Sequence, residues 1–154
     1  DFLFEDFNVT ESIKEILEDY MPLLREKNFD IKIRDLNINI YSDKRGFEFI
    51  IAQILSNTIK YAGDSPRLEI VIEKQDNYTM LKFTDNGCGV KDCDINHIFE
   101  KGFTGDSGDI RKKSTGMGLY LAKHLADDLK IKIDVKSKWM SYFEISLYIS
   151  CNNG

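Results

Sequence analysis

Residues 53–61 read Gln-Ile-Leu-Ser-Asn-Thr-Ile-Lys-Tyr, and they lie in a stretch whose apolar spacing predicts a helix. Ser42 or Asp43 can cap this helix, which we expect to run to about Ala62. One stripe of the helix carries Gln53, Asn57, Lys60 and Tyr61. An Asn oxygen is a hard ligand for Mg²⁺, and a Lys amine meets phosphate as a point charge. This stripe therefore predicts either a metal-phosphate site or an ordinary solvated face.

The segment Asp85-Asn86-Gly87-Cys88-Gly89 follows directly after a predicted strand. An Asp carboxylate accepts hydrogen bonds but donates none, so it suits the amino group of adenine and disfavours the carbonyl of guanine. The two glycines allow the backbone to approach a flat ligand without a clash. An ordinary Asp-Asn-Gly turn explains the same residues and stays open as the alternative.

A third segment, Ser114-Thr115-Gly116-Met117-Gly118-Leu119, stands where we expect another helix to begin. That helix is predicted from Thr115 to about Leu129. Glycines at a helix N-terminus expose free N–H groups and the positive end of the helix dipole to phosphate. Many helices begin after a glycine loop, so this pair carries weight only together with the other two segments.

The rest of the chain predicts the scaffold around these segments. Val9 to about Glu26 has helical apolar spacing, with Asn8 or Thr10 as the N-cap. Alternating patterns predict strands at 29–33, 36–41, 67–74, 78–84, 131–136 and 142–149. About three helices accompany five or six strands, and strand pairs are neighbours in sequence. This pattern favours an α+β sandwich over alternating βαβ units.

Composition excludes several classes of function. The chain has 154 residues, a common size for one domain, and a net charge of −5 with no basic excess that would indicate a nucleic-acid partner. Its three cysteines form no Cys-x-x-Cys pair, which argues against a disulfide framework or a zinc site and favours a reducing cytoplasm. We expect neither a membrane-spanning segment nor a signal peptide, and we interpret the chain as part of a longer protein.

In their order along the chain, these motifs resemble the catalytic ATP-binding domain of sensor histidine kinases, which shares its fold with the ATPase domains of gyrase, Hsp90 and MutL. Residues 53–61 look like the N box, 85–89 the G1 box, 98–103 the F box and 116–119 the G2 box. The motif sequences most resemble those of membrane-anchored kinases of Gram-positive bacteria that sense antimicrobial peptides. The resemblance implies one domain over residues 1–154 with the Bergerat (GHKL) fold, a mixed sheet of about five strands against about three helices.

The resemblance also implies ATP and Mg²⁺ as cofactors. Asn57 would coordinate the metal, and the catalytic residues would be Gln53, Asn57 and Lys60. The nucleotide-binding residues would be Asn57, Lys60, Tyr61, Asp85, Gly87, Gly89, Lys101, Gly102, Thr104, Thr115, Gly116, Gly118, Leu119 and Ser141. Residues 101–115 would form a mobile lid over the phosphates. We expect Phe99 and Phe103 to pack in the core rather than on the ligand.

Two residues depart from the family pattern. Related ATPases carry a water-activating Glu where this chain has Gln53, whose amide cannot act as a base, so we do not expect fast hydrolysis. Met140 and Ser141 stand where the family has Gly-Thr, and Ser141 could supply the hydroxyl near adenine.

Neither His97 nor His124 is followed by the acidic residue typical of the family's phosphoacceptor. The resemblance therefore implies an acceptor His on a separate helical dimerisation domain, with a response regulator as an indirect partner. The full protein would be a homodimer, and this chain the cytoplasmic part of a membrane-anchored bacterial kinase. The alternatives are an ATP hydrolase of the same fold, an anti-sigma-type Ser/Thr kinase and a non-catalytic nucleotide sensor.

Overall fold

The structure is a computed structural model that describes residues 1–34, 37–103 and 118–151. Its main layer is a five-stranded mixed sheet, in the order β2 (Asp30–Arg34), β4 (Arg67–Lys74), β5 (Tyr78–Asp85), β7 (Tyr142–Ser150) and β6 (Lys132–Lys138). Strands β2 and β4 pair in parallel, and the other neighbouring strands pair antiparallel. The predicted hairpin of β4 and β5 is confirmed.

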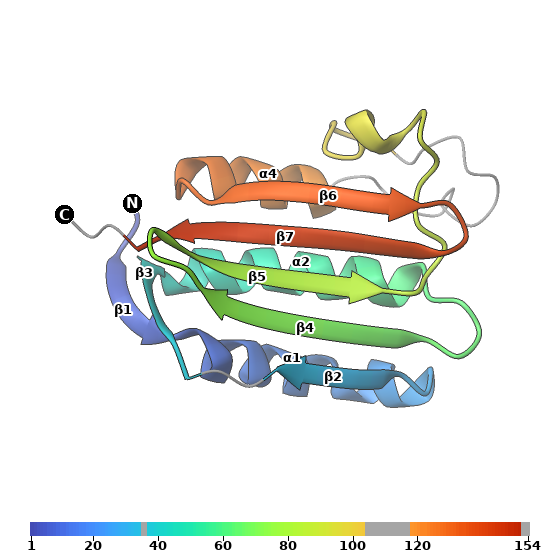
Figure 1. Ribbon diagram of the computed structural model, residues 1–154, viewed down its shortest axis with the longest axis horizontal. Coiled ribbons are helices and arrows are strands. Elements are labelled where there is room, and N and C mark those ends of the chain that lie inside the picture. The colour runs from blue at the N-terminus through green and yellow to red at the C-terminus, as the bar shows by residue number, and fades with distance from the viewer. Residues whose placement is uncertain (35–36, 104–117, 152–154) are drawn as a thin grey trace.

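Helices α1 (Val9–Glu26), α2 (Lys44–Lys60) and α4 (Gly118–Asp128) form the second layer, all on one face of the sheet (Figure 1). A short 3₁₀ helix, η1 (Ile95–His97), lies in the connection that follows β5. Asn8 caps α1, because its side chain accepts a hydrogen bond from the backbone N–H of Glu11. The predicted α+β sandwich is therefore confirmed.

The two faces of the sheet differ in chemistry. Alternate strand residues that face the helices are almost fully buried, among them Leu68, Ile70, Ile72, Leu81, Phe83, Ile145 and Leu147. They pack with Phe47, Ile50, Ile51, Ile54 and Leu55 of α2 in one core. Each such side chain contributes about 1.5–3 kcal/mol by leaving water. The residues that alternate with them are largely polar and lie on the opposite face of the sheet. Helices α1, α2 and α4 do not cover that face (Figure 1).

A second, two-stranded sheet joins β1 (Phe4–Asn8) to β3 (Asn39–Asp43), and the sequence did not predict β1. Phe7 is the one buried residue of β1, so its sequence shows no run of alternating apolar positions. The strand predicted at 36–41 begins later, at Asn39, and the strand predicted at 29–33 begins one residue later, at Asp30.

Asp43 joins β1 to the start of α2. One carboxylate oxygen accepts a hydrogen bond from the backbone N–H of Gly46 (2.7 Å), and the other accepts one from Leu3 (2.8 Å). The bond from Gly46, and then that from Leu3, hold the pKa of Asp43 below its ordinary value. A group with a lowered folded-state pKa stabilises the fold above its unfolded pKa, and this stability is lost as the pH falls through the folded pKa.

We therefore expect Asp43→Asn to destabilise the protein at about pH 7 by roughly 1 kcal/mol, and by less at an acidic pH below the ordinary pKa of Asp, because the stability that the lowered pKa provides is lost as the pH falls. Urea unfolding at the two pH values measures this difference. Asp76→Asn, in the exposed turn between β4 and β5, is the matched control. An equal loss at both pH values for Asp43→Asn would contradict the assigned role of the charge.

Candidate functional site

The carboxylate of Asp85 closes the end of β5 on the helix side of the sheet. The residue is 7% exposed. One oxygen accepts a hydrogen bond from the hydroxyl of Thr58 on α2 (3.2 Å), and the other accepts one from the backbone N–H of Gly87 (2.8 Å). Each carboxylate oxygen has two lone pairs, so this group can also accept a hydrogen bond from a ligand amino group. The helix layer and the following loop thus orient one acceptor.

The loop after Asp85 requires glycine at two positions because other backbone segments approach it. A Cβ on Gly87 would lie 2.6 Å from the carbonyl oxygen of Tyr61. Gly89 has φ +66°, and its Cβ would lie 2.6 Å from the carbonyl oxygens of both Lys138 and Tyr142. The sequence predicts that these two glycines allow a flat ligand to approach the backbone. The structure adds that the protein's own backbone occupies the space of a side chain.

Gln53, in the polar stripe of α2, lies against the start of α4. Gln53 and Asn57 are half-buried and Lys60 is exposed. A Cβ on Gly118 would lie only 2.9 Å from the side-chain oxygen of Gln53, so the two predicted motifs are in contact. Tyr61 ends α2 as a buried residue, and its carbonyl oxygen accepts the backbone N–H of Cys88 (3.0 Å).

The other predicted residues are placed in part. Leu119, in the first turn of α4, belongs to the hydrophobic core. Lys101 and Gly102 are exposed, and Gly102 has φ +75°. Phe99 and Phe103 pack against the core, as predicted. Thr104, Thr115, Gly116 and most of the predicted lid at 101–115 lie outside the described residues.

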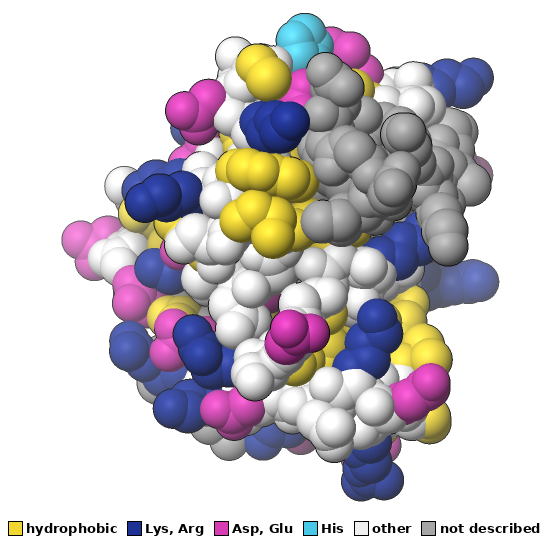
Figure 2. Space-filling model, turned by 90° about the vertical axis from the view of Figure 1, so that its right-hand side faces the viewer, with side chains coloured by type: hydrophobic (Ala, Val, Ile, Leu, Met, Phe, Trp, Pro, Cys, Tyr) yellow, Lys and Arg dark blue, Asp and Glu magenta, His cyan; other side chains and the backbone are white. Residues whose placement is uncertain are grey.

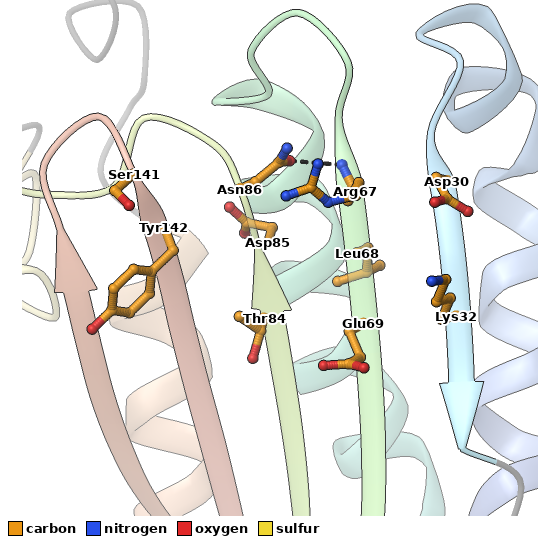
Figure 3. A pocket seen from close by; sticks show the side chains of 10 residues that line it. All are labelled: Asp30, Lys32, Arg67, Leu68, Glu69, Thr84, Asp85, Asn86, Ser141 and Tyr142. Carbon is orange, nitrogen blue, oxygen red and sulfur yellow. Dashed lines mark hydrogen bonds between the residues drawn. The ribbon is translucent and has the colours of Figure 1, made fainter.

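The turn between β6 and β7 lies against the loop after Asp85. Met140, which the resemblance aligns with a family glycine, takes the left-handed conformation (φ +62°), and its N–H donates to the carbonyl of Cys88 (2.5 Å). Ser141 and Asp85 line one cavity of about 390 Å³ at this end of the sheet (Figure 3). The cavity also contacts Asp30, Lys32, Arg67, Leu68, Glu69, Thr84, Asn86 and Tyr142.

The outer surface at this end combines apolar and basic groups. Figure 2 looks onto it and shows apolar side chains gathered beside basic ones. The amine of Lys91 lies 5.4 Å from the ring centre of Trp139, a cation–π contact. Met140, the next residue along, is 61% exposed.

Sequence reasoning missed two contributors to the site. Thr58 was not among the predicted site residues, although its hydroxyl, on the buried side of α2, requires a hydrogen-bond partner and so indicates a polar contact. Ser137 of β6 accepts the backbone N–H of Val90 (2.8 Å). No local pattern indicates this contact, because it joins segments 47 positions apart.

Among the described residues, no group of three His, Cys, Asp or Glu side chains could hold a metal ion. Mg²⁺ accepts other oxygen ligands too, such as an Asn amide together with phosphate oxygens. The half-buried amide of Asn57, one turn of α2 beyond Gln53, is a candidate for such a ligand. In the described part of the chain, none of the helices has the length and apolarity needed to cross a bilayer.

The fold and this site define a class of nucleotide-binding domain. Residues 42–150 match the sequence family described as "Histidine kinase-, DNA gyrase B-, and HSP90-like ATPase", and the chain belongs to that family. Membership assigns ATP to the chain as its nucleotide.

Within the family, the chain is similar to bacterial sensor kinases. It is 32% identical to the sensor histidine kinase YxdK of Bacillus subtilis (strain 168), over 89% of this chain and 43% of that protein. It is 40% identical to the sensor protein BceS of the same organism, over 72% of this chain and 32% of that protein. The chain thus spans less than half the length of these relatives. The resemblance to Gram-positive sensor kinases is confirmed.

Solved structures show the same fold at lower identity. The catalytic domain of histidine kinase ThkA superposes with a TM-score of 0.83 at 19% identity, over 97% of this chain and 98% of that one. The histidine kinase AdeS of Acinetobacter baumannii has a TM-score of 0.81 at 22% identity, over 99% of this chain and 70% of that one.

Proposed function

We propose that residues 1–154 are the catalytic ATP-binding domain of a sensor histidine kinase, which transfers the γ-phosphoryl group of ATP to a histidine on a separate helical dimerisation domain. The observation that carries the proposal is the buried Asp85 carboxylate, oriented by Thr58 and Gly87 to accept the adenine amino group. The family match and the sensor-kinase relatives support the same assignment.

Phosphoryl transfer depends mainly on positioning and on neutralising charge. In this proposal Asn57 supplies an oxygen to Mg²⁺, and Lys60 contacts the phosphates from the next turn of α2. Bound Mg²⁺ would neutralise charge on the phosphates. Tyr61, Gly118, Lys101 and Gly102 would complete the nucleotide contacts, with Ser141 near the base.

Gln53 favours transfer over hydrolysis. Its amide has no basic group to activate water, and its oxygen faces the start of α4. A neutral imidazole from a partner is a stronger nucleophile than unactivated water. We therefore propose a kinase domain rather than an ATP hydrolase.

The match covers less than half of these relatives, so the partners proposed next are those of the whole protein rather than of this chain alone. We infer a membrane-anchored homodimer in which this domain lies in the cytoplasm and serves its own dimerisation helices. A response regulator would then receive the phosphoryl group from the histidine.

Labelled ATP, Mg²⁺ and a candidate dimerisation domain, incubated with this chain, test the function. We expect phosphate on the partner that is labile in acid, as phosphohistidine is. Acid-stable phosphate would indicate a Ser/Thr kinase instead, and steady phosphate release without a partner would indicate a hydrolase. ATP binding with no phosphate transfer to any dimerisation domain would indicate a non-catalytic nucleotide sensor instead of a kinase.

Asn57→Ala tests the proposed metal contact. We expect affinity for Mg-ATP to fall by about tenfold or more, while Mg-free ATP changes much less, because the lost oxygen serves the cation. Calorimetry with Mg²⁺ and with a chelator measures both values. Ser56→Ala, at the adjacent half-buried position of α2, is the matched control. Equal losses with and without Mg²⁺ would remove Asn57 from the metal site.

A further inference from the structure

The hydroxyl of Ser137, on β6, links three segments that are far apart in the chain. It accepts a hydrogen bond from the N–H of Val90, in the loop after Asp85, at 2.8 Å. It donates one to the carbonyl of Tyr142, at the start of β7, also at 2.8 Å. This hydroxyl therefore makes two hydrogen bonds, one as an acceptor and one as a donor, and alanine can form neither.

One further hydrogen bond and one close backbone approach join the same two segments. The N–H of Met140 donates to the carbonyl of Cys88. Gly89 leaves no room for a Cβ between the carbonyl oxygens of Lys138 and Tyr142. We call residues 87–90, residues 138–142 and Ser137 the clasp. Within it, Ser137 is the side chain that bonds to both segments.

The clasp is linked to the Asp85 carboxylate through residues 87–90 of the loop. Gly87, the first residue of the loop segment, donates its N–H to the Asp85 carboxylate. Val90, the last, is 1% exposed, so its N–H has little access to water if the Ser137 hydroxyl is removed. Loss of that bond therefore favours a shift of the loop, which would carry the Gly87 N–H away from Asp85.

We propose that Ser137 is a positioning residue of the nucleotide site, which holds the loop so that the Asp85 carboxylate keeps the orientation that recognises adenine. This inference rests on the proposed role of Asp85. The clasp lies at the end of the sheet that carries Asp85, so it acts on the base rather than on the phosphates. Its loss should weaken ATP, ADP and adenosine by the same factor.

The experiment compares Ser137→Ala with Ser137→Thr, which keeps the hydroxyl, and with Ser146→Ala as a matched control on β7. Ser146 is equally a strand serine, but it contacts a cavity on the uncovered face. We expect Ser137→Ala to bind ATP, ADP and adenosine about tenfold more weakly, whereas the Thr and control variants bind within about threefold of the parent. If the Ala variant does not fold, Ser137→Cys keeps the shape with a much weaker hydrogen bond and should lose affinity in the same direction.

Two direct readouts separate positioning from a general loss of stability. The Val90 amide should exchange faster in Ser137→Ala, while amides of the β4–β5 hairpin keep their protection. Trp139, the single tryptophan of the chain, lies in the clasp, so its emission should change in Ser137→Ala and not in Ser146→Ala.

Unchanged affinity in Ser137→Ala, a loss confined to ATP, or an equal loss in the Thr variant would overturn the inference. If the parent itself binds no adenine nucleotide, the proposed function fails first and the inference fails with it. A parent that binds ATP alongside an unaffected Ser137→Ala rejects the inference alone.

Discussion

Asp85→Asn should weaken ATP binding by about 100-fold, equivalent to about 2.7 kcal/mol, and should remove most of the preference for ATP over GTP. In the variant, the amide oxygen of Asn can still accept a hydrogen bond from the N–H of Gly87, and its NH₂ group can donate one to the Thr58 hydroxyl. The fold is therefore retained. The amino group of adenine, however, would then meet a donor where the parent has an acceptor.

Calorimetric titration of the parent and the variant with ATP and with GTP measures this change. Asp134→Asn, an exposed carboxylate on the uncovered face of β6, is the control and should bind both nucleotides as the parent does. If Asp85→Asn retains both the affinity and the selectivity of the parent, adenine is recognised elsewhere and the proposed site is wrong.

Gly89→Ala should reduce the free energy of unfolding by about 3 kcal/mol or more, and nucleotide binding should fall with it. The new Cβ would lie 2.6 Å from two backbone carbonyl oxygens, in segments that cannot move independently of β6 and β7. The left-handed φ of +66° adds about 1–2 kcal/mol of strain for a residue other than glycine.

Two other glycines separate these causes. Gly102 also has a positive φ, but none of the described residues has an atom within 4 Å of its Cβ position, so Gly102→Ala should cost only the strain, about 1 kcal/mol. Gly63 has neither feature, so Gly63→Ala should lie within about 0.5 kcal/mol of the parent. Chemical denaturation of the three variants measures the series. A loss for Gly89→Ala no larger than that for Gly102→Ala would show that the loop can move away from the turn.

Local pattern was sufficient for much of the scaffold. Helix α1 was predicted with its bounds and one of its two candidate caps, because apolar spacing and an N-cap are properties of neighbouring residues. The β4–β5 hairpin was predicted because both strands alternate around a short turn. The order of the motifs predicted the class of nucleotide-binding domain, which the family match confirmed.

Strand pairings and hydrogen bonds between distant segments could not be predicted from local sequence pattern. The pairing of β1 with β3 and the parallel pairing of β2 with β4 join residues more than 30 positions apart. The hydrogen bond from Thr58 to Asp85 spans 27 positions, and that from Val90 to Ser137 spans 47.

The sequence by itself determined the approximate bounds of the helices and of the hairpin, and which family the motifs indicate. The tertiary structure alone decided why Gly87 and Gly89 must be glycines, that Met140 takes a left-handed conformation in the turn, and that Thr58 and Ser137 bond to Asp85 and to the loop after it. The physical reason is that helical and strand periodicity is a local property of the chain. Hydrogen-bond partners and steric limits at a site are set by whichever backbone the fold brings within about 3 Å.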